Sequence, residues 1–287
     1  MPSYVNLSYR FFGKISRSVK GNFLDIREDL QRANIAYTLE EYLSTAFFTT
    51  ALAFVLETIS LSFIFGLIRF SVVSALLLSI TLSLAISGVL FFLFYSYPAA
   101  AAKTRQSKIK KILPFAVSYM ATISSSRLPP IVLFRTLAGF KEYGQIAEEA
   151  ANVSRDVDVF GMTFSAAVKK QAKRSPSTEF RELLWGINSI IASGGDLTFY
   201  LKQKSEEMMN DYRRRIRKYA QDLSLFVEIY LTLIITGSIF FIVLSSIISA
   251  ISGGLGTIFV QAFVVFILLP LLSIGFIIII KSISPVE

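Results

Sequence analysis

The fold is decided by two apolar stretches near the N-terminus, LSTAFFTTALAFVLETISLSFIF at residues 43–65 and VVSALLLSITLSLAISGVLFFLFYSY at residues 72–97. A helix of ~20 apolar residues crosses the ~30 Å hydrocarbon core of a bilayer, and each stretch reaches that length. Only residues 66–71 lie between them, so the second helix must turn back along the first. Residues 43–97 are therefore predicted to form a transmembrane hairpin.

A second pair of apolar stretches follows at residues 225–250 and 257–280, around the glycine-rich turn SGGLG at residues 252–256. This pattern predicts a second hairpin over residues 225–280 and a short tail over residues 281–287. Pro270 lies inside the fourth span and removes one backbone hydrogen bond, which predicts a kink.

The distribution of charge predicts the orientation of the four spans. The chain of 287 residues is 53% hydrophobic and 17% charged, with 29 Lys and Arg against 20 Asp and Glu. Of the basic residues, 21 lie in residues 98–224 and six in residues 1–42, whereas the two short turns hold one, Arg69. Because cytoplasmic segments carry the excess of Lys and Arg, both termini and the central segment are expected on the cytoplasmic side of the membrane.

The polar segments are predicted to be helical. Residues 1–42 place apolar side chains among basic ones, which fits a helix near the membrane surface and equally a solvated helical lead-in. Thr38 and Glu41 have capping-box spacing, so the first span is expected to begin at about Leu39. Residues 98–224 repeat apolar residues at helical spacing and predict a cytoplasmic bundle. The predicted fold class is all-α, with two transmembrane hairpins flanking this bundle.

Proline, glycine and capping residues divide the bundle into helices. Pro130 and Pro176 suit first helical turns, the latter with Ser175 as its cap. Asp196 is expected to cap a long helix, and this helix has no Gly or Pro before Thr236, so it is expected to continue through Glu228 into the third span. The predicted turn residues are Pro114, Pro129, Pro130, Gly161, Pro176, Gly194, Gly195 and Asp196.

The composition excludes several kinds of site. The sequence has no His and no Cys, which excludes disulfides, His or Cys nucleophiles and the zinc and haem sites that use these ligands. It has no phosphate loop of the form GxxxxGK[ST], so nucleotide hydrolysis is not expected. Basic residues are interleaved with the acids Glu148, Glu149, Asp156 and Asp158, which fits a solvated helix face better than a metal site. We predict no catalytic residue, metal, cofactor or nucleic acid partner.

Two acids and one row of small residues lie within the spans. A charged group in lipid costs ~2.5–3.5 kcal/mol, so Glu57 and Glu228 are expected to face protein. Each acid has two possible roles. One is a structural pairing or hydrogen bond, for Glu228 with Arg214 or Arg217, and the other is a part in force transmission or ion movement. The second span has a small residue at every fourth position, which favours close packing within the bundle or between copies, and the first span of the same chain is the simpler partner. The row consists of Ser71, Ala75, Ser79, Ser83 and Ser87.

Two basic clusters flank the central segment and are expected to attract anionic lipid head groups, by ~1 kcal/mol per residue, or to bind an acidic partner. They are Lys103, Arg105, Lys108, Lys110 and Lys111 after the second span, and Arg213, Arg214, Arg215, Arg217 and Lys218 before the third.

From about residue 112 to about residue 237, the order of these parts resembles the type II secretion system F family, in the form found in platform proteins of archaella, archaeal type IV pili and tight-adherence pili. The resemblance is carried by LPF at 113–115, SSSRLPP at 124–130, YG at 143–144, IAEEA at 146–150, DVDVFG at 156–161, SPS at 175–177, SGGDL at 193–197, YL at 200–201 and EIY at 228–230. Two features depart from the family pattern: Arg127 stands where glycine is common, and the chain has one such module where many archaeal relatives have two.

The resemblance implies a non-enzymatic platform in the cell membrane of an archaeon or bacterium. Such a platform docks on a hexameric secretion ATPase and couples its motion to the extraction of pilin-like subunits and to filament assembly. It also implies pairing with itself or with a second F-domain subunit. The ATPase contact is expected on exposed basic residues of the bundle, with Arg127, Lys141, Lys169, Lys170 and Lys173 as candidates.

Two other classes of function compete with this interpretation. One is a four-span transporter or channel subunit with Glu57 and Gln261 as its intramembrane polar groups. The other is a transferase acting on lipid phosphates through Asp156 and Asp158, whose spacing supports no mechanism that we can assign.

Overall fold

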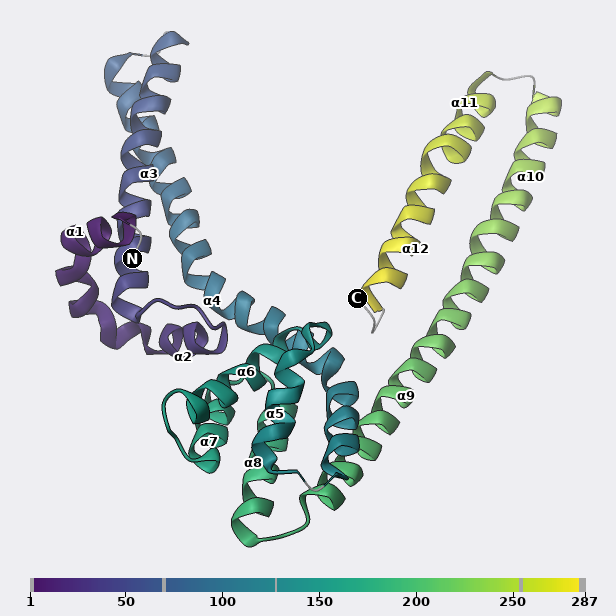
Figure 1. Ribbon diagram of the computed structural model, residues 1–287. Coiled ribbons are helices and arrows are strands. Elements are labelled where there is room, and N and C mark those ends of the chain that lie inside the picture. Colours follow the sequence, from purple (N-terminus) through teal and green to yellow (C-terminus); the bar gives the residue numbers. More distant parts are fainter. Residues whose placement is uncertain (1–2, 69–70, 127, 253–254, 284–287) are drawn as a thin grey trace. The chain divides into compact units, whose positions relative to one another are not determined.

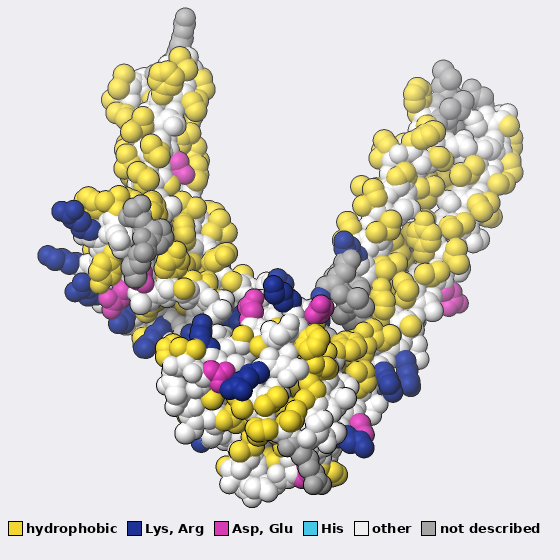
Figure 2. Space-filling view, viewed as in Figure 1, with side chains coloured by type: hydrophobic (Ala, Val, Ile, Leu, Met, Phe, Trp, Pro, Cys, Tyr) yellow, Lys and Arg dark blue, Asp and Glu magenta, His cyan; other side chains and the backbone are white. Residues whose placement is uncertain are grey.

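The computed structural model describes residues 3–68, 71–126, 128–252 and 255–283, and every regular element in these ranges is a helix (Figure 1). Four helical runs are long and apolar enough to cross a membrane: Leu39–Leu67, Val72–Ser124, Leu197–Ile251 and Phe259–Lys281. The predicted all-α class with four spans is confirmed. On the face shown in Figure 2, hydrophobic side chains cover the shafts of both hairpins. The chain divides into two compact units, Met1–Lys202 and Gln203–Glu287.

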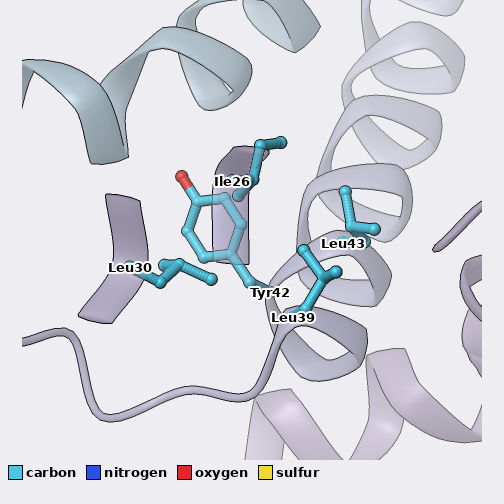
Figure 3. Packing of buried hydrophobic residues seen from close by; sticks show 5 residues of the cluster. All are labelled: Ile26, Leu30, Leu39, Tyr42 and Leu43. Carbon is cyan, nitrogen blue, oxygen red and sulfur yellow. The ribbon is translucent and has the colours of Figure 1, made fainter. Parts of the chain in front are cut away.

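The first unit begins with short helices packed around the base of the first hairpin. Its N-terminal elements are α1 (Ser3–Val19), the 3₁₀ turn η1 (Lys20–Phe23), α2 (Leu24–Arg32) and α3 (Leu39–Leu67). Side chains of α2 and α3 meet in a buried apolar cluster of Ile26, Leu30, Leu39, Tyr42 and Leu43 (Figure 3). The hydroxyl of Tyr42 also donates to the carbonyl of Phe94 in the second span, at 2.8 Å. The polar N-terminal segment is therefore anchored to the hairpin.

The first span begins at the residue that the sequence predicts. Thr38 Oγ1 accepts from the backbone N–H of Glu41 at 3.3 Å, and Glu41 Oε2 accepts from the backbone N–H of Thr38 at 2.8 Å. This reciprocal capping box satisfies backbone donors that the first turn of a helix leaves without partners. It fixes the start of α3 at Leu39.

The second span and the first helix of the bundle are one element, α4 (Val72–Ser124), which passes through Pro98 and Pro114. The prediction of a turn at Pro114 is therefore wrong. Pro114 is buried, and its neighbours Leu113 and Ala116 are at most 2% exposed. Packing of this apolar face outweighs the ~3 kcal/mol that an interior proline costs a helix.

Four shorter helices complete the bundle of the first unit. They are α5 (Pro130–Gly139), α6 (Gln145–Asp158), α7 (Phe164–Arg174) and α8 (Thr178–Ser193), with the 3₁₀ turn η2 (Lys141–Tyr143) between the first two. α5 packs on α6, α6 on α7 and α7 on α8. Their apolar faces form a core with α4, whose largest fully buried members include Met120, Phe134, Ile146, Phe180, Leu183 and Ile187. This core holds the surface helices in fixed positions within the unit.

The long helix α9 (Leu197–Ile229) leads into the second hairpin. It has no break at residues 218–225, and η3 (Tyr230–Thr236) and α10 (Gly237–Ser252) follow it directly, so the predicted continuity into the third span is confirmed. η3 consists of π-helical turns, which are wider than α-helical ones.

The second hairpin closes with α11 (Leu255–Phe263), η4 (Val264–Leu268) and α12 (Leu269–Ile283). Gln261 Nε2 donates to Ser246 Oγ at 3.1 Å, and the hydroxyls of Tyr230 and Ser273 lie 3.2 Å apart, so polar side chains join its two sides. η4 is π-helical and ends just before Pro270, so the backbone irregularity lies beside the residue that lacks an N–H. Gly253 and Gly254 of the predicted turn, and Arg69 of the first turn, lie outside the described residues.

Candidate functional site

Helix α7 carries three of the predicted docking residues. It begins at Phe164 because Thr163 Oγ1 accepts from the backbone N–H of Ala166. Lys169 and Lys173, one turn apart, are exposed on its outer side. Its opposite side is buried in the bundle at Ala167, Val168 and Ala172. Within the described ranges neither exposed lysine forms an ion pair, so both remain available to an acidic partner.

Lys170 has a different environment from its neighbours. Its ammonium lies 2.8 Å from Asp156 Oδ1 and 5.9 Å from the centre of the Phe160 ring. Asp156 itself is only 3% exposed, so this contact joins α6 to α7 across the turn between them. We therefore assign Lys170 to the structure of the bundle.

The remaining predicted docking residues lie on other elements. Lys141 is the first residue of η2 and is exposed. Arg127 lies outside the described residues. Of the predicted docking residues, Lys169 and Lys173 are thus the two that the structure places together on the exposed side of one helix.

The acids proposed for a transferase are both engaged by basic side chains. Arg135 Nε and Nη2 donate to the two carboxylate oxygens of Asp158, at 3.0 and 2.5 Å. This bidentate contact holds the pKa of Asp158 below its ordinary value and raises the pKa of Arg135. Asp156 is occupied by Lys170. In the part of the chain that the structure describes, no three acidic residues are grouped so as to hold a metal ion.

A buried polar network joins α2, α4, α6 and α7. Arg105 of α4 is 7% exposed, and its Nη1 donates to the carbonyl of Arg32 at the end of α2, at 3.1 Å. Its Nε donates to Gln145 Oε1 at 2.6 Å, and its Nη2 lies 2.8 Å from Glu149 Oε1. The other oxygen of Glu149 accepts from the amide of Gln171 on α7. One guanidinium therefore connects the N-terminal helices to the bundle.

Burial raises the pKa of Glu149 to about 7, although the charges of Arg105 and Arg174 lower it; the neighbouring Glu148 adds to the rise. The carboxylate is fully buried, and among the described atoms Oε1 accepts no hydrogen bond although it lies at ion-pair distance from Arg105. Loss of hydration is thus only partly compensated. The charge of Glu149 therefore changes near neutral pH.

This network corrects two sequence predictions. Glu149 is not on a solvated helix face, and Arg105 is not available to lipid head groups, because both are buried. The signal for Glu149 was present in the sequence, since it shares a helical face with Ile146, Ala150 and Val153, all buried. Two further members of the basic clusters are also engaged: Lys110 with Glu179 at 2.6 Å, and Arg214 with Asp211.

Most predicted turn residues occupy helix boundaries. Asp196 Oδ1 accepts from the backbone N–H groups of Thr198 and Phe199, which confirms it as the cap of α9. Gly161 and Gly194 have φ values of +63° and +69°, a conformation that favours glycine. α5 begins at Pro130, directly after Pro129, and Gly195 lies between Gly194 and Asp196.

The predicted cap at Ser175 is wrong by two residues. α8 begins at Thr178 and its cap is Ser177, which accepts from the backbone N–H of Phe180. Pro176 therefore precedes the helix, in the turn that follows α7.

The row of small residues packs against the first span of the same chain, as the sequence favours. Ala75, Ser79, Ser83 and Ser87 are each at most 4% exposed, and α3 packs along α4. Ser83 Oγ lies 2.7 Å from Thr58 Oγ1, and Ser87 Oγ donates to Glu57 Oε2 at 3.3 Å. Ser71 does not belong to this face, because it is exposed and caps α4. Glu57 thus has a structural partner within the hairpin.

Glu228 differs from the sequence expectation. It is exposed on α9, and within the described residues it forms no ion pair with Arg214 or Arg217.

The region that contains the bundle and the start of the third span has known relatives. Residues 116–245 match the family model of the type II secretion system (T2SS), protein F. The resemblance predicted from the sequence is confirmed. The protein F region thus begins within α4, includes the basic face of α7 and Glu149, and extends into α10.

Curated relatives add an archaeal context. The chain is 26% identical to flagella accessory protein J of Methanocaldococcus jannaschii over 182 residues, which are 63% of this chain and 32% of that protein. It is 25% identical to flagella accessory protein J of Methanococcus voltae over 178 residues, 62% of this chain and 31% of that protein. An uncharacterized protein of M. jannaschii is 22% identical over 134 residues, 47% of this chain and 22% of that protein. The matches thus cover a third or less of each relative.

No solved structure matches the chain. The four apolar helical runs and the protein F region together indicate a multi-pass membrane protein.

Proposed function

We propose that this chain is a non-enzymatic platform subunit of a type IV pilus-like or archaellum machine in the cell membrane, with both termini on the inner side. The observation that carries the proposal is the match of residues 116–245 to protein F, to which the two flagella accessory proteins J add the archaellum context. The pilin-like subunits of the filament and a second copy, or a second subunit of the same kind, are its partners in the membrane.

A hexameric secretion ATPase docks on the bundle through exposed basic residues. Lys169 and Lys173 on α7 are the central contacts in this proposal, because neither forms an ion pair with an Asp or Glu within the described ranges. Opposite charges on the ATPase would steer its approach and fix its orientation.

The helix that begins at α9 transmits the motion of the bundle. The run Leu197–Ile251 comprises 55 residues without an intervening loop, or roughly 80 Å at 1.5 Å per residue. A displacement of its first turn, which Asp196 and the bundle hold, would therefore be passed along the helix to the third span, where pilin-like subunits are extracted.

The test is co-purification of the detergent-solubilised chain with the secretion ATPase of the same cell. The double variant Lys169→Glu and Lys173→Glu is compared with the double variant Arg155→Glu and Lys202→Glu, which has the same change of charge at exposed positions of α6 and α9. Lys170 is left unchanged because its substitution would break the contact with Asp156.

We expect the wild type and the control to retain the ATPase and the α7 variant to lose it. Retention by the α7 variant would place the dock elsewhere on the bundle. Failure of the wild type to bind without nucleotide, with ADP and with an ATP analogue would contradict the platform function and favour the transporter class.

A further inference from the structure

The N-terminal helix α1 has three faces with different chemistry. One face is buried against α3 and includes Val5, Ser8 and Ser16, which are at most 5% exposed. A second face is apolar but exposed: Tyr4, Leu7, Phe11 and Ile15 are 40%, 45%, 65% and 51% exposed and recur at three- and four-residue spacing. The third face is basic and exposed, with Arg10, Lys14 and Arg17. Exposure of such an apolar row to water is unfavourable, so an apolar row beside a basic one is typical of a helix that contacts a membrane or another protein.

Hydrogen bonds fix how α1 lies along α3. The hydroxyl of Tyr4 is 2.8 Å from Thr49 Oγ1, Ser8 Oγ is 3.2 Å from Thr45 Oγ1, and Ser16 Oγ donates to the carbonyl of Glu40 at 2.9 Å. The two helices are therefore antiparallel. The N-terminal end of α1 lies beside the part of α3 that is further along the span.

The length of α3 places this contact at the membrane boundary. The helix has 29 residues, or about 43 Å at 1.5 Å per residue, and exceeds the ~30 Å hydrocarbon core by roughly nine residues. With its far end at the outer turn, the surplus lies at residues 39–47 on the inner side, and Phe48 comes at the boundary.

Aromatic rings gather at this level. The rings of Tyr4, Phe11 and Phe12 have centroids 5.5, 6.1 and 6.2 Å from that of Phe48. Aromatic side chains are enriched where hydrocarbon meets head groups. The exposed apolar row of α1 therefore continues the lipid-facing surface of the first span at its inner edge.

The charge of α1 matches an anionic surface. Its sequence contains no Asp or Glu. Arg17 lies 3.9 Å from Glu40 and over the Tyr9 ring, whereas Arg10 and Lys14 have no acidic partner among the described residues. A symmetric contact with a second copy would place this basic row against itself, which is unfavourable, whereas head-group phosphates would neutralise it.

We propose that α1 is an interfacial helix that binds the inner leaflet. Tyr4, Leu7 and Phe11 lie at the edge of the acyl chains, beside Phe48. Ile15, next to Ser16 and Glu40, lies at the level of the head groups, and Arg10 and Lys14 bind the phosphates of anionic phospholipids. This site differs from the two basic clusters that flank the bundle, and it does not depend on the ATPase.

The absence of cysteine from the sequence allows a direct test with single-cysteine variants of the full chain. Leu7→Cys and Phe11→Cys report on the part of the apolar row at the boundary, and each checks the other against local misfolding. Gly21→Cys in η1 is the matched control, because this position is exposed and an added Cβ meets nothing within 4 Å. Each variant carries a nitroxide label and is reconstituted in nanodiscs of phosphatidylcholine, with or without phosphatidylglycerol.

We expect labels at positions 7 and 11 to be shielded from a water-soluble nickel chelate by about tenfold relative to position 21, because the polar chelate is excluded from the acyl chains. The shielding should be greater with phosphatidylglycerol, and the added Arg10→Gln and Lys14→Gln changes should abolish this difference. Equal access at positions 7, 11 and 21 in both lipids would overturn the interfacial helix. Equal shielding with and without phosphatidylglycerol would overturn the binding of lipid phosphates by Arg10 and Lys14. Spin–spin broadening between labels on two chains would show that a second copy, and not lipid, covers the apolar row of α1.

Discussion

Replacement of Arg105 by alanine tests whether the buried network holds the first unit together. The change removes the guanidinium that lies 2.8 Å from the fully buried Glu149 and donates to the carbonyl of Arg32 and to Gln145. Breaking a buried ion pair from one side costs ~3–5 kcal/mol, because an uncompensated charge remains inside the protein. For a unit of this size that loss lowers the melting temperature by roughly 6–20 °C.

The cost of the substitution should depend on pH. The folded wild type has the pKa of Glu149 raised from 4.5 to about 7, so the folded state binds this proton more tightly than the unfolded state. The contribution of this proton to the free energy of unfolding is therefore fully present below pH 4.5 and is lost as the pH rises to about 7. Loss of the positive Arg105 raises the pKa of Glu149 further. At about pH 6 the carboxyl of the variant is then neutral, and the penalty is limited to the hydrogen bonds that the carbonyl of Arg32 and Gln145 lose. At about pH 8 the burial of an unpaired charge, or its neutralisation, adds to this loss and gives the full cost.

Thermal unfolding of the full chain in detergent, followed by the fluorescence of its single tryptophan, Trp185 on α8, measures this effect. Arg135→Ala is the control, since it removes an exposed ion pair and should change the melting temperature little at either pH. Glu149→Gln should flatten the dependence of the wild-type melting temperature on pH between about 5 and 8. An equal loss for Arg105→Ala at both pH values, or an unchanged pH dependence in Glu149→Gln, would refute the reasoning.

Two further substitutions test the first hairpin. Ser83→Leu should destabilise it by roughly 1–3 kcal/mol because Ser83 is fully buried 2.7 Å from Thr58, whereas Leu84→Ile, at an exposed position, should not; melting temperatures in detergent compare the two. Thr38→Ala removes the capping box and should weaken the first turn of α3 by ~0.5–2 kcal/mol, seen as faster amide exchange at residues 40–43. Unchanged exchange in Thr38→Ala would mean that packing alone holds this turn.

The sequence predicts those features that depend on neighbouring residues. Hydropathy locates the four spans because each is a continuous run, and the caps at Thr38 and Asp196 are recognised because donor and acceptor are at most three residues apart. The exposed Lys169 and Lys173 follow from helical spacing on α7. The small residues of the second span indicate a close helix contact because their spacing alone defines a face.

Tertiary structure decides what each polar side chain meets. The sequence places Arg105 in a basic cluster that is expected to be exposed. Its partners Arg32 and Gln145 lie 73 and 40 residues away along the chain, so only the folded structure shows that it is buried. Pro114 predicts a turn, but the packing of buried residues on both sides of it keeps α4 helical. The lipid-facing row of α1 is defined only once α3 covers its neighbouring face. Local sequence determines where a helix forms, because its caps and hydrogen bonds join residues close along the chain. The burial of a side chain and its ion-pair partner depend instead on which helices pack together in space.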